Sequence, residues 1–376
     1  MNILLCTPYN INSNVVQGGI AIWAQNIMNY YEGLKDNEGL LINVIPFDRK
    51  VRRNNSGNNH LLKRAWYGFI DYLNPIHETQ SRLKDGNIDI LHLCTSASIS
   101  LIKDIFILKI ARRHKVNTTI HFHFGRIPEL CQQSNWEWRL IRRVARLADT
   151  VITMDNKSCN TLKNSGINNV CYLPNPLSLS ITSLIEQESS HIDRDEYKLC
   201  FVGHVIASKG VFELVKACKN IGGIKLDIIG KVSLDVQKKL QMYADEGDWL
   251  SFKGELDHNQ VIREMLSSTI FVLPTYTEGF PNVILESMAC GCAIVTTPVG
   301  AIPEMLNIDS SVPCGLCCSP RDVDGIRRNI QYFLDHPVEA QLFSNRAVKR
   351  VNKMYAIPQV WKQLVDIWKN SHTNDF

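Results

Sequence analysis

The sequence predicts an α/β protein with two domains, each a doubly wound parallel sheet of the Rossmann type. Short apolar runs of strand length alternate with longer segments of helical apolar spacing, which is typical of consecutive βαβ units. The chain has 376 residues, more than one ordinary core contains, and this length favours two domains. Its hydrophobic content of 45% and charged content of 21% are those of a globular protein.

The first domain is expected to cover residues 1–178. Its strands are predicted at residues 3–5, 42–45, 88–91, 118–122 and 150–152, and its helices from residue 20, near residues 61–72, and from residues 101 and 136. Residues 49–60 are polar and turn-rich, which predicts a mobile loop.

Residues 179–196 are rich in Ser, Glu and Asp, and we expect a linker and hinge there. The second domain is expected at residues 197–354, and residues 355–376 begin with a turn followed by helical spacing. No apolar run reaches the roughly 18 residues that a transmembrane helix needs, and the N-terminus enters a strand without a basic leader. A cytoplasmic protein is therefore expected.

Two carboxylates, Glu278 and Glu286, lie eight residues apart around a Gly-Phe-Pro turn. Proline is tolerated in the first turn of a helix, so a helix should begin near Pro281, with Glu286 about a turn and a half inside it. Residues 270–274 read as a buried strand, which places Glu278 on the loop at its carboxyl end, where open parallel sheets hold ligands. The free N–H groups of the helix N-terminus make this an anion site, suited to a diphosphate.

This order of strand, acidic loop and helix resembles the E-x7-E segment of retaining glycosyltransferases with the GT-B fold, glycosyltransferase family 4 (glycosyl transferases group 1). Further segments of that family's pattern follow in the same order, at residues 18–20, 201–205, 209–211, 226–230, 252–254 and 297–304. The resemblance implies two Rossmann-like domains that face a central cleft. It also implies an acceptor-side N-terminal domain, a nucleotide-sugar-binding C-terminal domain, and a last helix, within residues 355–376, that crosses back to the first domain.

The resemblance also implies roles for charged residues. Glu286 would accept hydrogen bonds from the ribose hydroxyls of the donor, since an ionised carboxylate can hold a cis diol with both oxygens; the alternative is an exposed helix glutamate. Glu278 would stabilise positive charge that develops at the anomeric carbon of the donor sugar. Lys209 would hold the diphosphate leaving group, unless it is an ordinary surface lysine.

Other expected donor-binding residues follow the same resemblance: Gly18, Gly19, Phe280, Asn282 and Val283. At Gly18 and Gly19 the missing side chain would let the backbone approach a phosphate or an acceptor, although an unspecific turn is the competing interpretation.

Three histidines need separate interpretation. His204 stands where the family more often has arginine, a permanent charge that forks two N–H bonds onto phosphate. Either His204 donates one hydrogen bond to the diphosphate, or Lys209 and the helix N-terminus act without it. His121 and His123 share one face of a predicted strand. His123, nearer the loop, matches the histidine that the family places beside the donor sugar, and His121 would support it; core histidines are the alternative.

No metal and no cofactor are expected. The resemblance implies an enzyme without an Asp-x-Asp metal site, and the two such triplets here, at residues 193–195 and 322–324, lie away from the motif region. The cysteine cluster at Cys314, Cys317 and Cys318 has no second Cys or His pair at zinc-site spacing.

Positive charge concentrates in the first half. Residues 1–178 carry 21 Lys and Arg against 13 Asp and Glu, whereas the remainder carries 20 against 24. On the helix from Trp136, four arginines at i, i+3, i+4 and i+7 share a face: Arg139, Arg142, Arg143 and Arg146. Trp136, Leu140, Ile141 and Val144 are expected on another face. The basic face suits either an anionic membrane surface or plain solvent, and no nucleic-acid reader motif accompanies it.

The sequence therefore predicts a retaining, metal-independent glycosyltransferase. It would move a sugar from a nucleotide-diphosphate-sugar, with UDP or GDP expected, to an acceptor hydroxyl during bacterial surface-polysaccharide synthesis: capsule, O-antigen or exopolysaccharide. The acceptor would be lipid-diphosphate-linked, and the protein peripheral on the inner membrane face. A GT-B nucleotide-sugar epimerase and a non-catalytic GT-B partner subunit are the alternatives.

Overall fold

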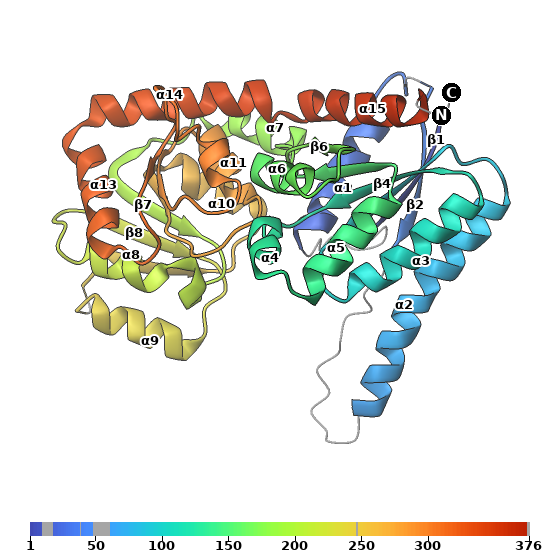
Figure 1. The fold of residues 1–376 in the computed structure, drawn as a ribbon. Helices are drawn as coiled ribbons and strands as arrows, with labels where there is room; N and C mark the ends of the chain where they lie inside the picture. The colour runs from blue at the N-terminus through green and yellow to red at the C-terminus, as the bar shows by residue number, and fades with distance from the viewer. Residues whose placement is uncertain (10–17, 38, 48–60, 246, 374–376) are drawn as a thin grey trace. The chain divides into compact units, whose positions relative to one another are not determined.

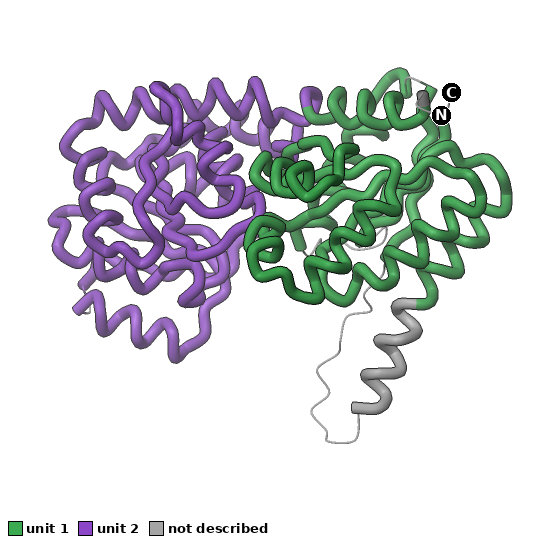
Figure 2. The backbone as a smooth tube through the Cα atoms, viewed as in Figure 1, with its two compact units in different colours: residues 1–174, 360–376 green, residues 175–359 purple. Residues whose placement is uncertain are grey.

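The computed structural model describes residues 1–9, 18–37, 39–47, 61–245 and 247–373, with only the backbone given for residues 61–72 and 373. The loop expected at residues 49–60 lies outside the described residues. The chain divides into two compact units, coloured separately in Figure 2. Unit 1 consists of Met1–Pro174 and Val360–Phe376, and unit 2 of Asn175–Gln359.

Unit 1 contains a six-stranded parallel sheet in the order β2-β1-β3-β4-β5-β6. Its strands are β1 (Asn2–Thr7), β2 (Leu41–Pro46), β3 (Ile90–Thr95), β4 (Asn117–Phe122), β5 (Thr150–Thr153) and β6 (Val170–Tyr172). Its helices are α1 (Gly19–Glu32), α2 (Leu61–Lys84), α3 (Ser100–Arg113), α4 (Ile127–Gln133), α5 (Trp136–Leu147), α6 (Asn156–Asn164) and most of α15 (Ile357–Thr373).

Each face of this sheet packs into its own hydrophobic core. Successive side chains of a strand point to opposite faces, so Leu4 of β1 joins one core and Ile3 and Leu5 join the other. The first core lies under α3, α4, α5 and α6. The second lies under α1 and α15, where Trp23 and Trp368 are buried. The last helix therefore completes the core of unit 1 despite its distance in sequence (Figure 1).

Unit 2 contains a second six-stranded parallel sheet, in the order β12-β11-β10-β7-β8-β9. Its strands are β7 (Asp195–Val202), β8 (Lys225–Ile229), β9 (Leu250–Gly254), β10 (Ser268–Leu273), β11 (Ala293–Thr296) and β12 (Leu316–Cys317). Its helices are α7 (Leu179–Glu188), η1 (Ala207–Lys209), α8 (Val211–Cys218), α9 (Leu234–Tyr243), α10 (His258–Leu266), α11 (Asn282–Ala289), α12 (Ile302–Met305), α13 (Val323–Asp335) and α14 (Pro337–Met354).

The strand order of unit 2 reverses between β7 and β10. From β7 the chain winds outward through β8 to β9, and from β10 it winds the other way through β11 to β12. Helices α7, α10, α11 and α14 pack together in one layer, whereas α8 packs on α9 and α13 in another. Ligands in such sheets bind outside the carboxyl ends of the strands at the reversal point.

Some boundaries differ from those expected. The expected linker at residues 179–196 holds α7, which begins at the N-cap Ser178 and lies in unit 2. Apolar residues Leu179, Ile181 and Ile185 give this segment a helical pattern among its polar residues. The helix near residues 61–72 continues through Pro75 to Lys84, and the Thr79 hydroxyl donates to the Pro75 carbonyl at 2.7 Å.

In α5 the expected apolar face is partly wrong. Trp136 is 54% exposed, and Trp138 takes the buried place beside Ile141 and Val144. Positions 138, 141 and 144 follow one another at i+3 steps, so they share a helix face that excludes position 136. Of the four arginines, Arg142 is half-buried and the other three are exposed.

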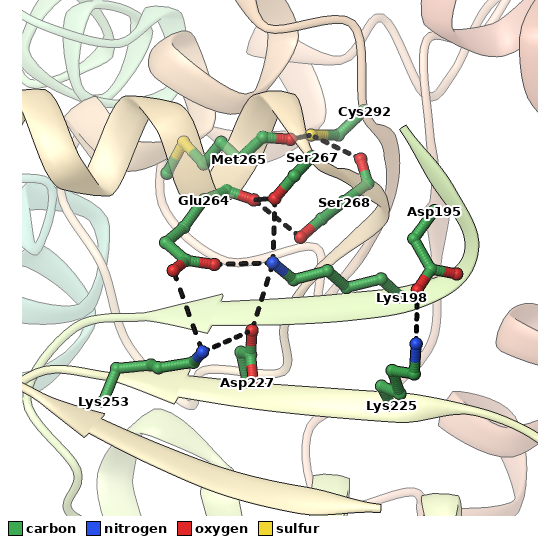
Figure 3. Close-up of polar contacts among 10 residues, drawn as sticks. All are labelled: Asp195, Lys198, Lys225, Asp227, Lys253, Glu264, Met265, Ser267, Ser268 and Cys292. Atoms are coloured by element: carbon green, nitrogen blue, oxygen red, sulfur yellow. Dashed lines mark hydrogen bonds and ion pairs between the residues drawn. The ribbon is translucent and has the colours of Figure 1, made fainter. Parts of the chain in front are cut away.

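A cluster of four charged side chains joins three strands to α10 (Figure 3). Lys198 of β7 lies 3.2 Å from Asp227 of β8 and 2.6 Å from Glu264 of α10, and Lys253 of β9 pairs with the same two carboxylates. The Lys198 ammonium also donates to the Ser267 hydroxyl at 2.8 Å. These partners satisfy a largely buried lysine and fix α10 against the sheet.

Among the residues that the structure describes, no helix combines the length and the apolar character needed to cross a membrane.

Candidate functional site

The loops after β7 and β10 meet at the reversal point of the unit 2 sheet. The Tyr276 N–H donates to the Ser208 carbonyl at 2.8 Å, and the Thr275 hydroxyl reaches the same oxygen at 3.3 Å. Gly210 has φ of 70° and lies so close to Pro274 that a Cβ would collide with the Pro274 carbonyl. A glycine is therefore required here on both steric and conformational grounds. This junction fixes η1 and the start of α8 beside the acidic loop.

Lys209 and Glu278, predicted separately from the sequence, form an ion pair across this junction. The Lys209 ammonium donates to Glu278 Oε1, and the two side chains are 23% and 15% exposed. Gly300, with φ of 56°, allows the loop after β11 to approach the Glu278 carbonyl, with which a Cβ at this position would collide. The Ala301 N–H donates to the Gly279 carbonyl at 2.9 Å and fixes the acidic loop from its other side.

Helix α11 begins as the sequence predicts. Pro281 is its N-cap residue in an extended conformation, and the helix runs from Asn282 to Ala289. Glu286 lies in this helix with its side chain only 9% exposed. Its Oε1 lies 3.3 Å from Nε2 of His258, the first residue of α10. A carboxylate buried to this degree is not the exposed helix glutamate that formed the alternative interpretation.

The remaining predicted residues of unit 2 lie around α11 and the β7 loop. Phe280 is buried, and its ring meets that of Tyr355 edge-on at 5.9 Å between centroids. The Asn282 amide oxygen accepts from the Asn175 side chain at 3.1 Å, and Val283 is half-buried. His204 follows β7 directly and has an exposed side chain.

Gly18, Gly19 and His123 belong to unit 1. Gly18 is the N-cap of α1, with φ of 92°, and its carbonyl accepts from the Ile22 N–H at 3.1 Å. His123 follows β4, and its ring contacts Trp23 of α1 at 5.0 Å between centroids. The helix that begins at the glycine pair thus packs on the predicted histidine. His123 keeps some exposed surface, whereas His121 has none.

Behind His123, a stack of polar rings extends into the core of unit 1. His121 lies 3.9 Å from His123 and 5.5 Å from His92 of β3, as ring centroids. Trp368 of α15 donates its indole N–H to Nδ1 of His92 at 3.0 Å. Burial lowers the pKa of His92 and of His123 to about 3 and places that of His121 well below 6.5. The three rings are therefore neutral at physiological pH.

His92, Cys94 and His121 bring potential metal-ligating atoms within 4.8 Å of one another. However, His92 Nδ1 accepts the Trp368 N–H, so the neutral ring carries its proton on Nε2 and has no free lone pair for a metal. Burial also raises the pKa of the Cys94 thiol, which opposes formation of the thiolate that binds metals. We interpret this group as a polar part of the core that supports His123.

Three residues near the candidate site were not predicted from the sequence: His258, Tyr276 and Arg321. His258 lies 28 residues from Glu286 in sequence; its one local signal is the capping box of Asp257 and Gln260, which marks the start of a helix but no ligand. The Arg321 guanidinium lies over the Tyr276 ring, 4.7 Å from the ring centroid. Burial and a hydrogen bond with Glu213 raise the pKa of Tyr276.

A known protein family matches the sequence of unit 2. Residues 184–350 match the model of the family described as glycosyl transferases group 1, and all of them lie in unit 2. The capsular polysaccharide biosynthesis glycosyltransferase CapM of Staphylococcus aureus is 26% identical over 197 residues, covering 49% of each chain. TuaC of Bacillus subtilis, a putative teichuronic acid biosynthesis glycosyltransferase, is 25% identical over 179 residues, 46% of this chain and 44% of that one. The chain spans about half the length of these curated relatives or less.

Comparison with solved structures covers both units. Sucrose-phosphate synthase from Thermosynechococcus elongatus superposes with a TM-score of 0.73 at 16% identity, covering 98% of each chain. Anabaena HepE in complex with UDP gives 0.69 at 13% identity, covering 98% of this chain and all of that one. These likenesses confirm the predicted α/β GT-B fold with two parallel sheets. The family model and the names of the relatives agree with the predicted enzyme class, glycosyltransferase.

Proposed function

We propose that this protein is a retaining glycosyltransferase that uses a nucleotide-diphosphate-sugar and no metal ion. The observation that carries the proposal is the Lys209–Glu278 ion pair at the strand reversal of unit 2, together with the buried Glu286 on the helix that follows, α11. One cation and two carboxylates at this place match what a donor needs: a charge partner for its diphosphate, one for its anomeric carbon and an acceptor for its ribose hydroxyls. The family-model match over residues 184–350 supports the proposal that the protein is a glycosyltransferase.

In the proposed reaction, the acceptor hydroxyl attacks the anomeric carbon from the side that the diphosphate leaves. The carbon–oxygen bond to the diphosphate breaks, and a phosphate oxygen of the leaving group takes the acceptor's proton. Lys209 and the N–H groups at the start of α8 and α11 would offset the charge of that leaving group in place of a metal. His204 would add a hydrogen bond, and His123, supported by His121, would bind the donor sugar.

The nucleotide is the first part to test. Structural neighbours include HepE in complex with UDP and with UDP-glucose, and we propose UDP or GDP for this chain. A thermal-shift panel of UDP, GDP, ADP and CDP should show one diphosphate that raises Tm, because a ligand at 100 times its Kd adds about 2.7 kcal/mol to stability. The gain should be lost in Glu286→Gln. No shift with any of the four would contradict the proposed donor class.

We further propose that the acceptor is lipid-linked and that unit 1 meets an anionic membrane surface. The face involved, here called the α3–α5 surface, combines exposed apolar and basic side chains. Its apolar members are Ile99, Ile102, Phe106 and Trp136, each 45% exposed or more. Its exposed basic members are Lys109, Arg113, Arg139, Arg143 and Arg146.

Two observations make this a single surface. Residues 99, 102, 106, 109 and 113 recur at helical spacing, so they share the outer face of α3. The Ser98 N–H donates to Glu137 Oε1 at 2.9 Å, which places the start of α3 against the start of α5, where Trp136 lies. Apolar side chains flanked by Arg and Lys suit an interface with acyl chains and anionic headgroups. With that acceptor, the proposed process is bacterial surface-polysaccharide assembly, as the names of CapM and TuaC also suggest.

Vesicle co-sedimentation tests the α3–α5 surface. The wild type should sediment with anionic vesicles at low salt and dissociate as ionic strength rises, because each basic residue contributes roughly 1 kcal/mol and salt screens it. Arg139→Glu with Arg143→Glu should abolish sedimentation. The matched control is Lys238→Glu with Lys239→Glu on α9 of unit 2, both exposed, which should sediment like the wild type. Equal sedimentation of both double variants would contradict the proposed surface.

A further inference from the structure

His258 lies beside the carboxylate that is proposed to hold the donor ribose. It is the first residue of α10, and the preceding Asp257 fixes its backbone through a capping box: Asp257 Oδ1 accepts from the Gln260 N–H at 2.9 Å, and the Gln260 side chain accepts from the Asp257 N–H at 3.2 Å. From this fixed start, the His258 ring places Nε2 3.3 Å from Glu286 Oε1.

The contact occupies only part of the carboxylate. Within the described residues, the Glu286 side chain has one polar partner, His258, which lies against Oε1. A carboxylate has about four lone-pair sites, so Oε2 and part of Oε1 stay available for two hydroxyl donors. The imidazole is 51% exposed, whereas the carboxylate is 9% exposed. The histidine is thus the solvent-facing member of the pair, and the carboxylate is the buried one.

We propose that His258 is a positioning residue that holds Glu286 in the orientation that binds the ribose diol of the donor. This inference rests on the proposed function, because Glu286 must be the diol ligand for its orientation to matter. A helix glutamate has several rotamers, and a hydrogen bond from a neighbouring helix selects one of them before the ligand arrives.

The charges around His258 set the pH range of this effect. The hydrogen bond to Glu286 raises the pKa of His258, burial opposes that rise, and the charge of Asp257 adds to it. On the elements packed against α10, Glu188 of α7 pairs with Arg263, and Lys198 of β7 pairs with Glu264. The pKa of His258 therefore lies above 6.5. The imidazolium form is present at pH values below this pKa and is lost as the pH rises through it.

Calorimetric titration of the nucleoside diphosphate chosen by the thermal-shift panel tests this role. Between pH 6.5 and 8.5 the wild-type affinity should fall about 3- to 10-fold more than that of His258→Gln, because a charge-assisted hydrogen bond becomes a neutral one. In the Glu286→Gln background, His258→Gln should add less than about a 2-fold loss, since residues that act through one another are not additive. The exposed His114→Gln serves as the matched control and should follow the wild type.

The 2′,3′-dideoxy form of the same diphosphate separates positioning from general stability. If His258 acts through Glu286 on the diol, the wild type and His258→Gln should bind this analogue with the same affinity at every pH tested. Additive losses in the double variant, or equal losses for both ligands, would overturn the inference while leaving diphosphate binding established. Failure of the wild type to bind any of the four diphosphates would instead overturn the proposed function.

Discussion

Glu278→Gln should lower kcat for sugar transfer by about 10²- to 10³-fold, the cost typical of removing one group aimed at developing transition-state charge. Donor affinity should change little or rise slightly, because the substitution also frees Lys209 from its ion pair and leaves the ammonium available to the diphosphate. Glu286→Gln should behave in the opposite way, with a raised KM for the donor and a smaller loss of kcat, because it binds a part of the donor that does not react.

Steady-state kinetics of both variants, together with the donor Kd from calorimetry, measure this division of roles. Glu129→Gln, an exposed carboxylate of α4 in unit 1, is the matched control and should keep both constants. Equal losses of kcat and of donor affinity in the two variants would remove the division. A Glu278→Gln enzyme that binds the donor far more weakly would mean that Glu278 is a binding residue.

Acid should destabilise unit 1 through its three buried histidines. Burial holds the pKa of His92 and His123 at about 3 in the folded protein, against 6.5 when unfolded, and it lowers that of His121 as well. The unfolded chain therefore binds more protons below pH 6.5, and stability falls as the pH drops from 6.5 towards 3. Each ring contributes up to about 1.4 kcal/mol per pH unit in that range. Urea unfolding at pH 7, 6, 5 and 4, followed by tryptophan fluorescence, measures the slope.

His121→Phe isolates one of these rings. Both of its ring nitrogens lack a hydrogen-bond partner among the described residues, so the substitution loses no hydrogen bond there. We expect equal or higher stability at pH 7 and a shallower loss towards pH 4 than in the wild type. The exposed His114→Phe should retain the wild-type slope. Parallel curves for wild type and His121→Phe would show that the ring does not contribute to acid sensitivity.

The fold was largely predictable because local signals dominate it. The alternation of buried strands and amphipathic helices predicted two parallel sheets, and Pro281 marked the start of α11 within one residue. The segment at residues 179–188 was misjudged because its polar composition outweighed the few apolar residues that make α7 helical. Trp136 was misplaced because large apolar side chains were assigned to the buried face, whereas helix geometry selects Trp138.

For the candidate site, sequence patterns indicate only groups of residues that lie close together in the chain. Glu278 and Glu286 share one motif, and Lys209 lies in a second short motif after β7. The ion pair between Lys209 and Glu278, however, forms only because the fold brings the two loops together. The pairing of Glu286 with His258 depends on the fold bringing the first residue of α10 to the Glu286 side chain of α11. The stack from His123 to Trp368 likewise joins β4, β3 and α15, which no sequence spacing encodes.

The central claim is sugar transfer with retention and without a metal. Its most direct test is an NMR time course in EDTA, with the sugar donor of the nucleotide selected by the thermal-shift panel and with lipid-linked or simple sugar acceptors. The proposal predicts release of the nucleoside diphosphate and a first-formed product with the donor's anomeric configuration, lost in Glu278→Gln. Turnover that requires an added divalent cation, or a product of inverted configuration, would contradict it.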